Sequence, residues 1–99
     1  MGVQIHPEAR VGHGVFVGGG AIISHNSTVG NFSLLGGASV FGSSVSVGEF
    51  TTIGVGVSVA PHVKIGSYSL VGVGAAVVKD LPDHVIAAGV PAKVLRAVE

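Results

Sequence analysis

The side chains best suited to chemistry in this chain of 99 residues are its five histidines: His6, His13, His25, His62 and His84. A histidine ordinarily titrates near neutral pH, so any of them could act as a general base and take a proton from a hydroxyl or an amine. Each could equally be an ordinary exposed turn residue. The chain has no cysteine, which excludes disulfides, thiolate metal sites and a cysteine nucleophile.

The elements that carry these histidines follow from a repeat of six residues. An apolar residue stands at every sixth position, thirteen times without a gap: Ile5, Val11, Val17, Ile23, Val29, Leu35, Phe41, Val47, Ile53, Val59, Ile65, Val71 and Val77. The next position is usually glycine, as at Gly12, Gly18, Gly30, Gly36, Gly42, Gly48, Gly54, Gly66 and Gly72. A small or β-branched residue stands four positions after the apolar one: Ala9, Val15, Ala21, Ser27, Ser33, Ser39, Val45, Thr51, Val57, Val63, Ser69 and Ala75. Columns that coincide over one register make chance a poor explanation.

A period of six predicts an all-β fold, a parallel β-helix. Six residues do not fit the 3.6-residue period of an α-helix, and they make three strand repeats of two. Three such segments close one coil, and coils stack about 4.8 Å apart through parallel strand hydrogen bonds. We expect the large apolar residue of each hexad to point into the resulting triangular prism, and the small residue to fill a narrow corner.

The β-helix is expected over residues 1–78, and residues 79–99 are expected to form a C-terminal capping segment. The hexad register ends after Val78, and residues 79–83 (KDLPD) are typical of a turn. Residues 85–90 should form a last extended piece, and residues 91–98 could form a short helix with Pro91 in its first turn. Such a segment is well placed to cover the last coil of a solenoid.

Composition indicates a protein that associates with copies of itself. Of all residues, 47% are hydrophobic and only 10% are charged, which is too little charge to keep a lone globule soluble. The net charge is zero with neutral histidines, so neither nucleic acid nor an anionic membrane is indicated as a partner. No apolar run approaches the roughly 18–20 residues that span a bilayer, and residues 1–12 lack the pattern of a signal peptide. We therefore expect a soluble cytoplasmic protein.

Several segments resemble a known family. Residues 77–82 (VVKDLP) and 88–94 (AGVPAKV) strongly resemble the C-terminal signature of the hexapeptide acyltransferases. Residues 20–32 (GAIISHNSTVGNF) resemble the active-site coil of the sialic acid and amino-sugar acetyltransferases, and residues 47–51 (VGEFT) continue the match. The likeness extends from about residue 18 to residue 96. It implies left-handed coiling, a homotrimer and an acetyl-CoA-dependent acetyltransferase that acts on a small acceptor such as an amino sugar.

The resemblance also assigns roles to residues. It implies that His25 is the general base on the acceptor hydroxyl or amine. The family places an acidic residue next to this histidine to orient its ring, and Asn26 stands there in this chain. A second histidine of the family corresponds to Leu34. These two departures, and the lack of the family's N-terminal nucleotide-sugar-binding domain, favour an alternative: a non-catalytic trimeric β-helix that has kept the fold and lost the chemistry.

By resemblance, CoA would lie in the groove between adjacent prisms of the trimer. The backbone around Gly54, Gly72 and Ala75 would follow this groove, and Lys79 and Lys93 could meet the nucleotide phosphates of CoA. The other interpretation of these two lysines is solubilising charge on the capping segment, and the sequence favours neither.

The remaining histidines are expected to have smaller roles. His13 lies two hexads before His25, on another side of the prism, as an exposed turn residue. His62 lies nearly two coils from His25 along a neighbouring corner and could approach a partner subunit's cleft, while His6 and His84 are read as terminal surface residues. Trimeric β-helices of this class also include carbonic anhydrases that bind zinc between subunits through histidines. Those enzymes place two histidines close together in one coil, and His25 and His62 have no such neighbour, so we expect no metal site.

Overall fold

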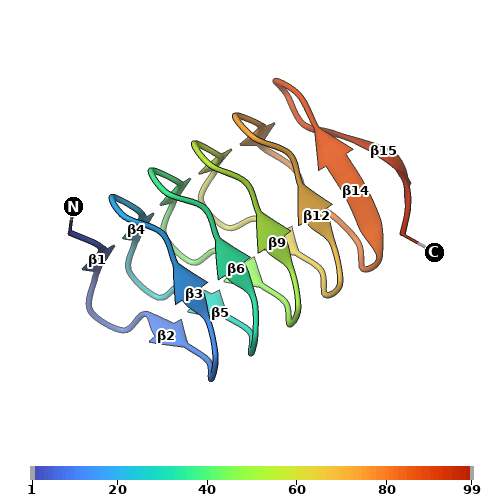
Figure 1. Ribbon diagram of the computed structural model, residues 1–99. Helices are drawn as coiled ribbons and strands as arrows, with labels where there is room; N and C mark the ends of the chain where they lie inside the picture. Colours follow the sequence, from blue (N-terminus) through green and yellow to red (C-terminus); the bar gives the residue numbers. More distant parts are fainter. Residues whose placement is uncertain (1, 99) are drawn as a thin grey trace.

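The computed structural model describes residues 2–98, which fold into a left-handed parallel β-helix with three faces (Figure 1). Thirteen strands of two residues follow one another at the predicted period, and two longer strands complete the fold. One face contains β1 (Gln4–Ile5), β4 (Ile22–Ile23), β7 (Val40–Phe41), β10 (Ser58–Val59) and β13 (Ala76–Val77). The second contains β2 (Arg10–Val11), β5 (Thr28–Val29), β8 (Ser46–Val47) and β11 (Lys64–Ile65). The third contains β3 (Phe16–Val17), β6 (Leu34–Leu35), β9 (Thr52–Ile53), β12 (Leu70–Val71), β14 (Val85–Ala88) and β15 (Lys93–Ala97).

From β1 to β13, successive coils are joined by parallel pairing in one constant register. Gln4 pairs with Ile22, and Ile22 with Val40, so each residue lies over the one 18 positions later. This register is the one that three hexads per coil require, and it confirms the predicted all-β parallel β-helix. It also means that residues 18 positions apart are neighbours on adjacent coils up to β13, whereas β14 pairs with β12 at a separation of 16 positions.

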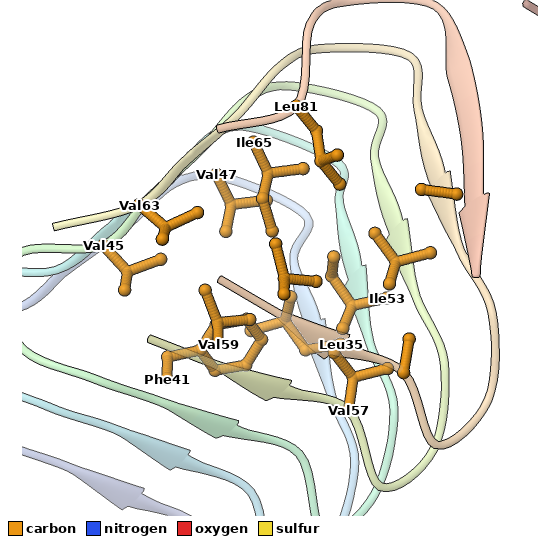
Figure 2. Close-up of a cluster of buried hydrophobic side chains, with 14 of the residues drawn as sticks. Leu35, Phe41, Val45, Val47, Ile53, Val57, Val59, Val63, Ile65 and Leu81 are labelled. Carbon is orange, nitrogen blue, oxygen red and sulfur yellow. The ribbon is translucent and has the colours of Figure 1, made fainter. Parts of the chain in front are cut away.

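The apolar residues of the hexads fill the interior of the prism (Figure 2). Ile23, Leu35 and Ile53 have no exposed surface, and Phe41 is 1% exposed. Burying one such side chain stabilises a fold by about 1.5–3 kcal/mol relative to leaving it in water. In the first described coil the equivalent apolar residues are less buried, and Ile5 is 52% exposed.

The corners of the prism are held together by buried hydroxyl groups. The Ser33 hydroxyl donates to the Gly48 carbonyl at 2.6 Å and accepts the Thr51 N–H at 3.0 Å. The Ser27 hydroxyl likewise donates to a carbonyl in the next coil, that of Gly42, at 2.9 Å. Each small residue of the hexad thus fills the corner and ties one coil to the next.

The turns at the corners require left-handed backbone geometry. Their second residue has a positive φ, which is 60° at Asn26, 66° at His62 and 71° at Gly56. Asparagine adopts this region more readily than most residues, and glycine adopts it without cost. The sequence position of Asn26 therefore has a structural reason as well as any chemical one.

The end of the chain is a strand where a short helix was expected. β14 pairs in parallel with β12, and β15 then pairs antiparallel with β14, with Lys93 opposite Ala88. The possible helix over residues 91–98 is therefore wrong. A helix there would leave the outer edge of β14 without partners, whereas β15 satisfies its backbone N–H and C=O groups.

Two carboxylates support the segment between the last regular coil and β14. The Asp80 carboxylate accepts the Lys64 N–H at 2.8 Å, and that of Asp83 accepts the Ser67 N–H at 2.7 Å. The Asp80 carboxylate replaces the backbone carbonyl that accepts the equivalent N–H in earlier coils. The Asp83 carboxylate continues a series of side-chain acceptors at the same turn, after Asn31 and Ser67. The described chain contains no helix that could cross a membrane.

Candidate active site

The turn that carries His25 and Asn26 belongs to one corner of the prism, referred to here as the His25 corner. It consists of the turn residues of five successive coils: Pro7 and Glu8, His25 and Asn26, Ser43 and Ser44, Pro61 and His62, and Lys79 and Asp80. Backbone hydrogen bonds join the turns, from the Ser44 N–H to the His25 carbonyl at 2.9 Å and from the His62 N–H to the Ser43 carbonyl at 3.0 Å. This corner separates the β1 face from the β2 face.

The local structure holds the His25 backbone firmly and leaves its side chain accessible. Ser24, which follows β4, donates its N–H to the Phe41 carbonyl at 3.3 Å, and the Ser27 N–H closes the turn on the Ser24 carbonyl at 3.3 Å. His25 and Asn26 themselves are exposed. A general base needs this combination, because it must reach a substrate from a fixed position.

The His25 ring contacts His6, a residue that the sequence analysis placed on the terminal surface. The two ring centroids are 5.2 Å apart and the planes are inclined by 63°, an edge-to-face arrangement. His6 is half-buried. Within residues 2–98, no hydrogen bond is formed by the His25 ring or by the side-chain amide of Asn26. The separation of 19 positions, one coil plus one residue, places the two residues on adjacent coils but does not by itself predict that their rings meet.

His62 lies on the His25 corner itself, so the expectation of a neighbouring corner is wrong. It occupies the same turn position as Asn26, two coils further along, and is exposed. At a coil spacing of about 4.8 Å, the two backbones are roughly 10 Å apart. His13 lies at a different corner, where its carbonyl accepts the Phe32 N–H at 2.8 Å. Leu34 is exposed on the outer side of β6.

Four of the five residues predicted to contact CoA gather at a second corner. Gly54 and Gly72 occupy equivalent positions on adjacent coils, so close that a Cβ on Gly54 would lie 3.0 Å from the Gly72 carbonyl carbon. A Cβ on Gly72 would lie 3.1 Å from that of Ala88, which pairs with Lys93. Ala75 closes the same turn and is buried, with its N–H on the Gly72 carbonyl at 3.3 Å.

The fifth of these residues, Lys79, lies apart from the others at the His25 corner. The next residue, Asp80, binds the Lys64 backbone, which fixes this place. The N–H groups of Gly54, Gly72 and Ala75 all donate to carbonyls of the protein, at 2.9, 2.9 and 3.3 Å. Contacts of these five residues with CoA, and the catalytic roles of His25 and Asn26, stay predictions.

A stack of aromatic rings that was not predicted from the sequence runs along the third corner. Phe32, Phe50, Tyr68 and His84 lie one above another, with ring centroids 5.3, 5.3 and 5.1 Å apart. Spacings of 18 residues in the sequence were the available signal for the first three. The described residues enclose no pocket and contain no group of three or more His, Cys, Asp or Glu side chains that could hold a metal ion.

Comparison with known proteins points to acetyltransferases. No family model and no curated protein matches the sequence. Among solved structures, a histidine-to-asparagine mutant of perosamine N-acetyltransferase from Caulobacter crescentus, in complex with CoA and GDP-perosamine, is 39% identical with a TM-score of 0.75. The match covers 93% of this chain and 52% of that one.

Two further structures share the fold. Serine acetyltransferase from Neisseria gonorrhoeae is 30% identical, with a TM-score of 0.91, over 98% of this chain and 42% of that one. A hexapeptide-repeat-containing acetyltransferase from Vibrio cholerae O1 biovar eltor, complexed with acetyl coenzyme A, is 21% identical, with a TM-score of 0.89, over 96% of this chain and 65% of that one. The chain thus spans about half the length of the perosamine enzyme. The resemblance to hexapeptide-repeat acetyltransferases that the sequence indicated is confirmed.

Proposed function

We propose that this chain, similar in fold and sequence to hexapeptide-repeat acetyltransferases, transfers an acetyl group from acetyl-CoA to a small acceptor such as an amino sugar. The observation that carries the proposal is the 39% identity, over 93% of the chain, to an enzyme whose structure contains CoA and GDP-perosamine.

His25 is the general base in this proposal. The thioester supplies an acetyl group that is already activated, so the protein has to orient the acceptor and manage one proton. His25 takes this proton from the acceptor amine or hydroxyl as it attacks the thioester carbonyl. It then gives the proton to the sulfur of the departing CoA thiolate. Exposure of His25 on a backbone fixed from both sides supports the assignment.

We further propose a homotrimer with CoA in the groove between adjacent prisms. The third face supports association, because Phe16, Leu34 and Leu70 are 63%, 44% and 41% exposed on it. Apolar surface of this kind favours contact with another protein surface. Lys79 and Lys93, both exposed, would then bind phosphate groups of CoA, with the backbone at Gly54, Gly72 and Ala75 along the groove. The proposal keeps the cytoplasmic location that the sequence predicts.

A non-catalytic trimeric β-helix is the second candidate. Leu34 in place of a histidine favours it, and so does Asn26, whose neutral amide cannot stabilise an imidazolium as a carboxylate does. The two candidates differ in whether CoA binds at all, since a purely structural trimer has no use for that groove.

Titration calorimetry of acetyl-CoA into the purified protein, with the mass of the assembly measured in parallel, separates the candidates. Micromolar binding at one site per chain is the expected result. An intact trimer that binds no acetyl-CoA would leave the structural candidate and remove the role of His25. A stable monomer would contradict both candidates.

A further inference from the structure

His25 lacks the usual means by which a catalytic imidazole is oriented. A general base contributes fully only when its ring is held in the reactive geometry, and a polar partner commonly does this. Asn26, the neighbour in sequence, occupies a left-handed turn position, and within residues 2–98 its amide makes no hydrogen bond to the His25 ring. The neighbour therefore leaves the ring unconstrained in the folded chain.

His6 provides a constraint from the preceding coil. Its ring meets the His25 ring edge to face at a centroid distance of 5.2 Å. Edge-to-face pairs at this separation favour one arrangement by a factor of about 2 to 10. The contact also covers part of His6, which is half-buried although it lies in the first described coil.

The backbone of His6 is anchored to the strand that leads into the His25 turn. Its N–H donates to the Ile23 carbonyl at 2.9 Å, and its carbonyl accepts the Ala9 N–H at 3.2 Å. Ile23 ends β4, two residues before His25. The parallel register of β1 and β4 therefore sets the position of the His6 backbone relative to the His25 turn, and the ring contact adds to this the orientation of the side chains.

We propose that His6 is a positioning residue that holds the ring of His25 in its working orientation, in the role that a carboxylate neighbour plays in related enzymes. This inference rests on the proposed function of His25 as the base. His6 itself touches no substrate in this account. It acts through the His25 ring, so its loss should lower turnover and leave acetyl-CoA binding intact.

The test compares His6→Ala, which removes the ring, with His6→Phe, which keeps an aromatic ring of similar shape. We expect His6→Ala to reduce kcat about tenfold with the KM for acetyl-CoA unchanged, and His6→Phe to retain at least about half of the activity. His13→Ala, the same change at another corner of the first coil, should have no effect. Glu8→Gln tests the one carboxylate of the preceding turn and should also be neutral.

A second measurement does not depend on activity. In NMR spectra of specifically labelled histidines, the His25 ring of the parent protein should show cross-relaxation with the His6 ring and restricted ring motion. His6→Ala should release this motion, and His6→Phe should preserve it. A His25 ring that is equally mobile with and without His6 would overturn the inference, whatever the kinetics show.

The outcomes also distinguish this inference from the proposed function. Acetyl transfer that survives His25→Ala would contradict the role of His25 as general base, and His6 would then have no catalytic residue to position. Transfer that needs His25 and ignores His6→Ala would refute only the inference. If His6→Ala loosens the first coil, seen as a lower thermal midpoint, His6→Leu keeps the apolar volume without the ring and decides between packing in general and the ring contact.

Discussion

The ring of Phe50 lies nearly parallel to that of Tyr68 on the next coil, with centroids 5.3 Å apart and planes inclined by 10°. Phe32 stacks on the other side of Phe50 at the same distance. Phe50 and Tyr68 each remain 48% exposed. The stack thus joins consecutive coils outside the core, at a corner opposite the β1 face.

Phe50→Ala should destabilise the protein by about 1–3 kcal/mol, because it removes two ring contacts of roughly 0.5–1.5 kcal/mol each. Phe50 has a φ of 53°, and alanine has a similar backbone strain in this left-handed conformation. The change in stability therefore reports the loss of the ring contacts alone. Urea unfolding followed by circular dichroism measures the change. Val73→Ala is the control, since Val73 is 77% exposed at another corner and outside the stack, and it should cost much less. Equal costs for the two variants would mean that the stack adds no stability.

Ser33→Ala should cost about 1–3 kcal/mol of folding free energy. The buried hydroxyl serves the Gly48 carbonyl and the Thr51 N–H, and its removal leaves both groups without that partner inside the prism. Ser58→Ala, on the exposed side of β10, is the matched control and should change stability by less than about 0.5 kcal/mol. Thermal unfolding of the two variants side by side provides the comparison, and indistinguishable midpoints would argue against a structural role for the corner hydroxyls.

Gly36→Ala and Gly56→Ala separate two reasons for glycine. A Cβ on Gly36 would collide with the backbone of Gly54 and Val55 in the next coil, so we expect a loss of about 1–3 kcal/mol or more from the forced displacement. Gly56 has open space around it but a φ of 71°, so alanine should cost only about 1 kcal/mol there. Denaturant unfolding midpoints of both variants provide the measurement. A lower midpoint for Gly56→Ala than for Gly36→Ala would contradict the packing argument.

Asn26→Asp should raise kcat, by roughly three- to tenfold, if His25 is the base. A carboxylate next to the ring stabilises the imidazolium that forms when the proton is taken, and aspartate tolerates the left-handed φ of 60° at this turn. Ser44→Asp, at the equivalent turn of the next coil, where φ is 59°, adds the same charge at a greater distance and should have a smaller effect. Steady-state transfer assays at several pH values provide the measurement. Equal gains from both variants would indicate a general charge effect in place of a specific partner for His25.

The sequence by itself determined the fold and the histidine that deserves the first test. Thirteen apolar positions recur every six residues from Ile5 to Val77. A helix with a period of 3.6 residues would distribute them around its axis, whereas a strand with a period of two places them all on one side of the backbone. The repeat therefore predicts stacked parallel coils. The motif around His25 likewise needs no coordinates, since a turn residue flanked by two hexads has its place set by the register. The buried small column of Ser27, Ser33 and Thr51 follows from the same arithmetic.

Contacts between coils were decided only by the tertiary structure. His6 and His25 meet because β1 pairs with β4, and a separation of 19 positions does not by itself say which way two turn side chains lean. The strand β15 in place of a helix depends on the open edge of β14. The position of His62 on the His25 corner, by contrast, could have been obtained from the sequence, because 36 positions, or two whole coils, separate it from Asn26. Local propensity describes one segment at a time, whereas these features arise from the partner that lies beside the segment in space. In a solenoid the register predicts which residue lies one coil away, but the direction in which each side chain leans, and the pairing beyond the last regular coil, are decided only once the coils are stacked.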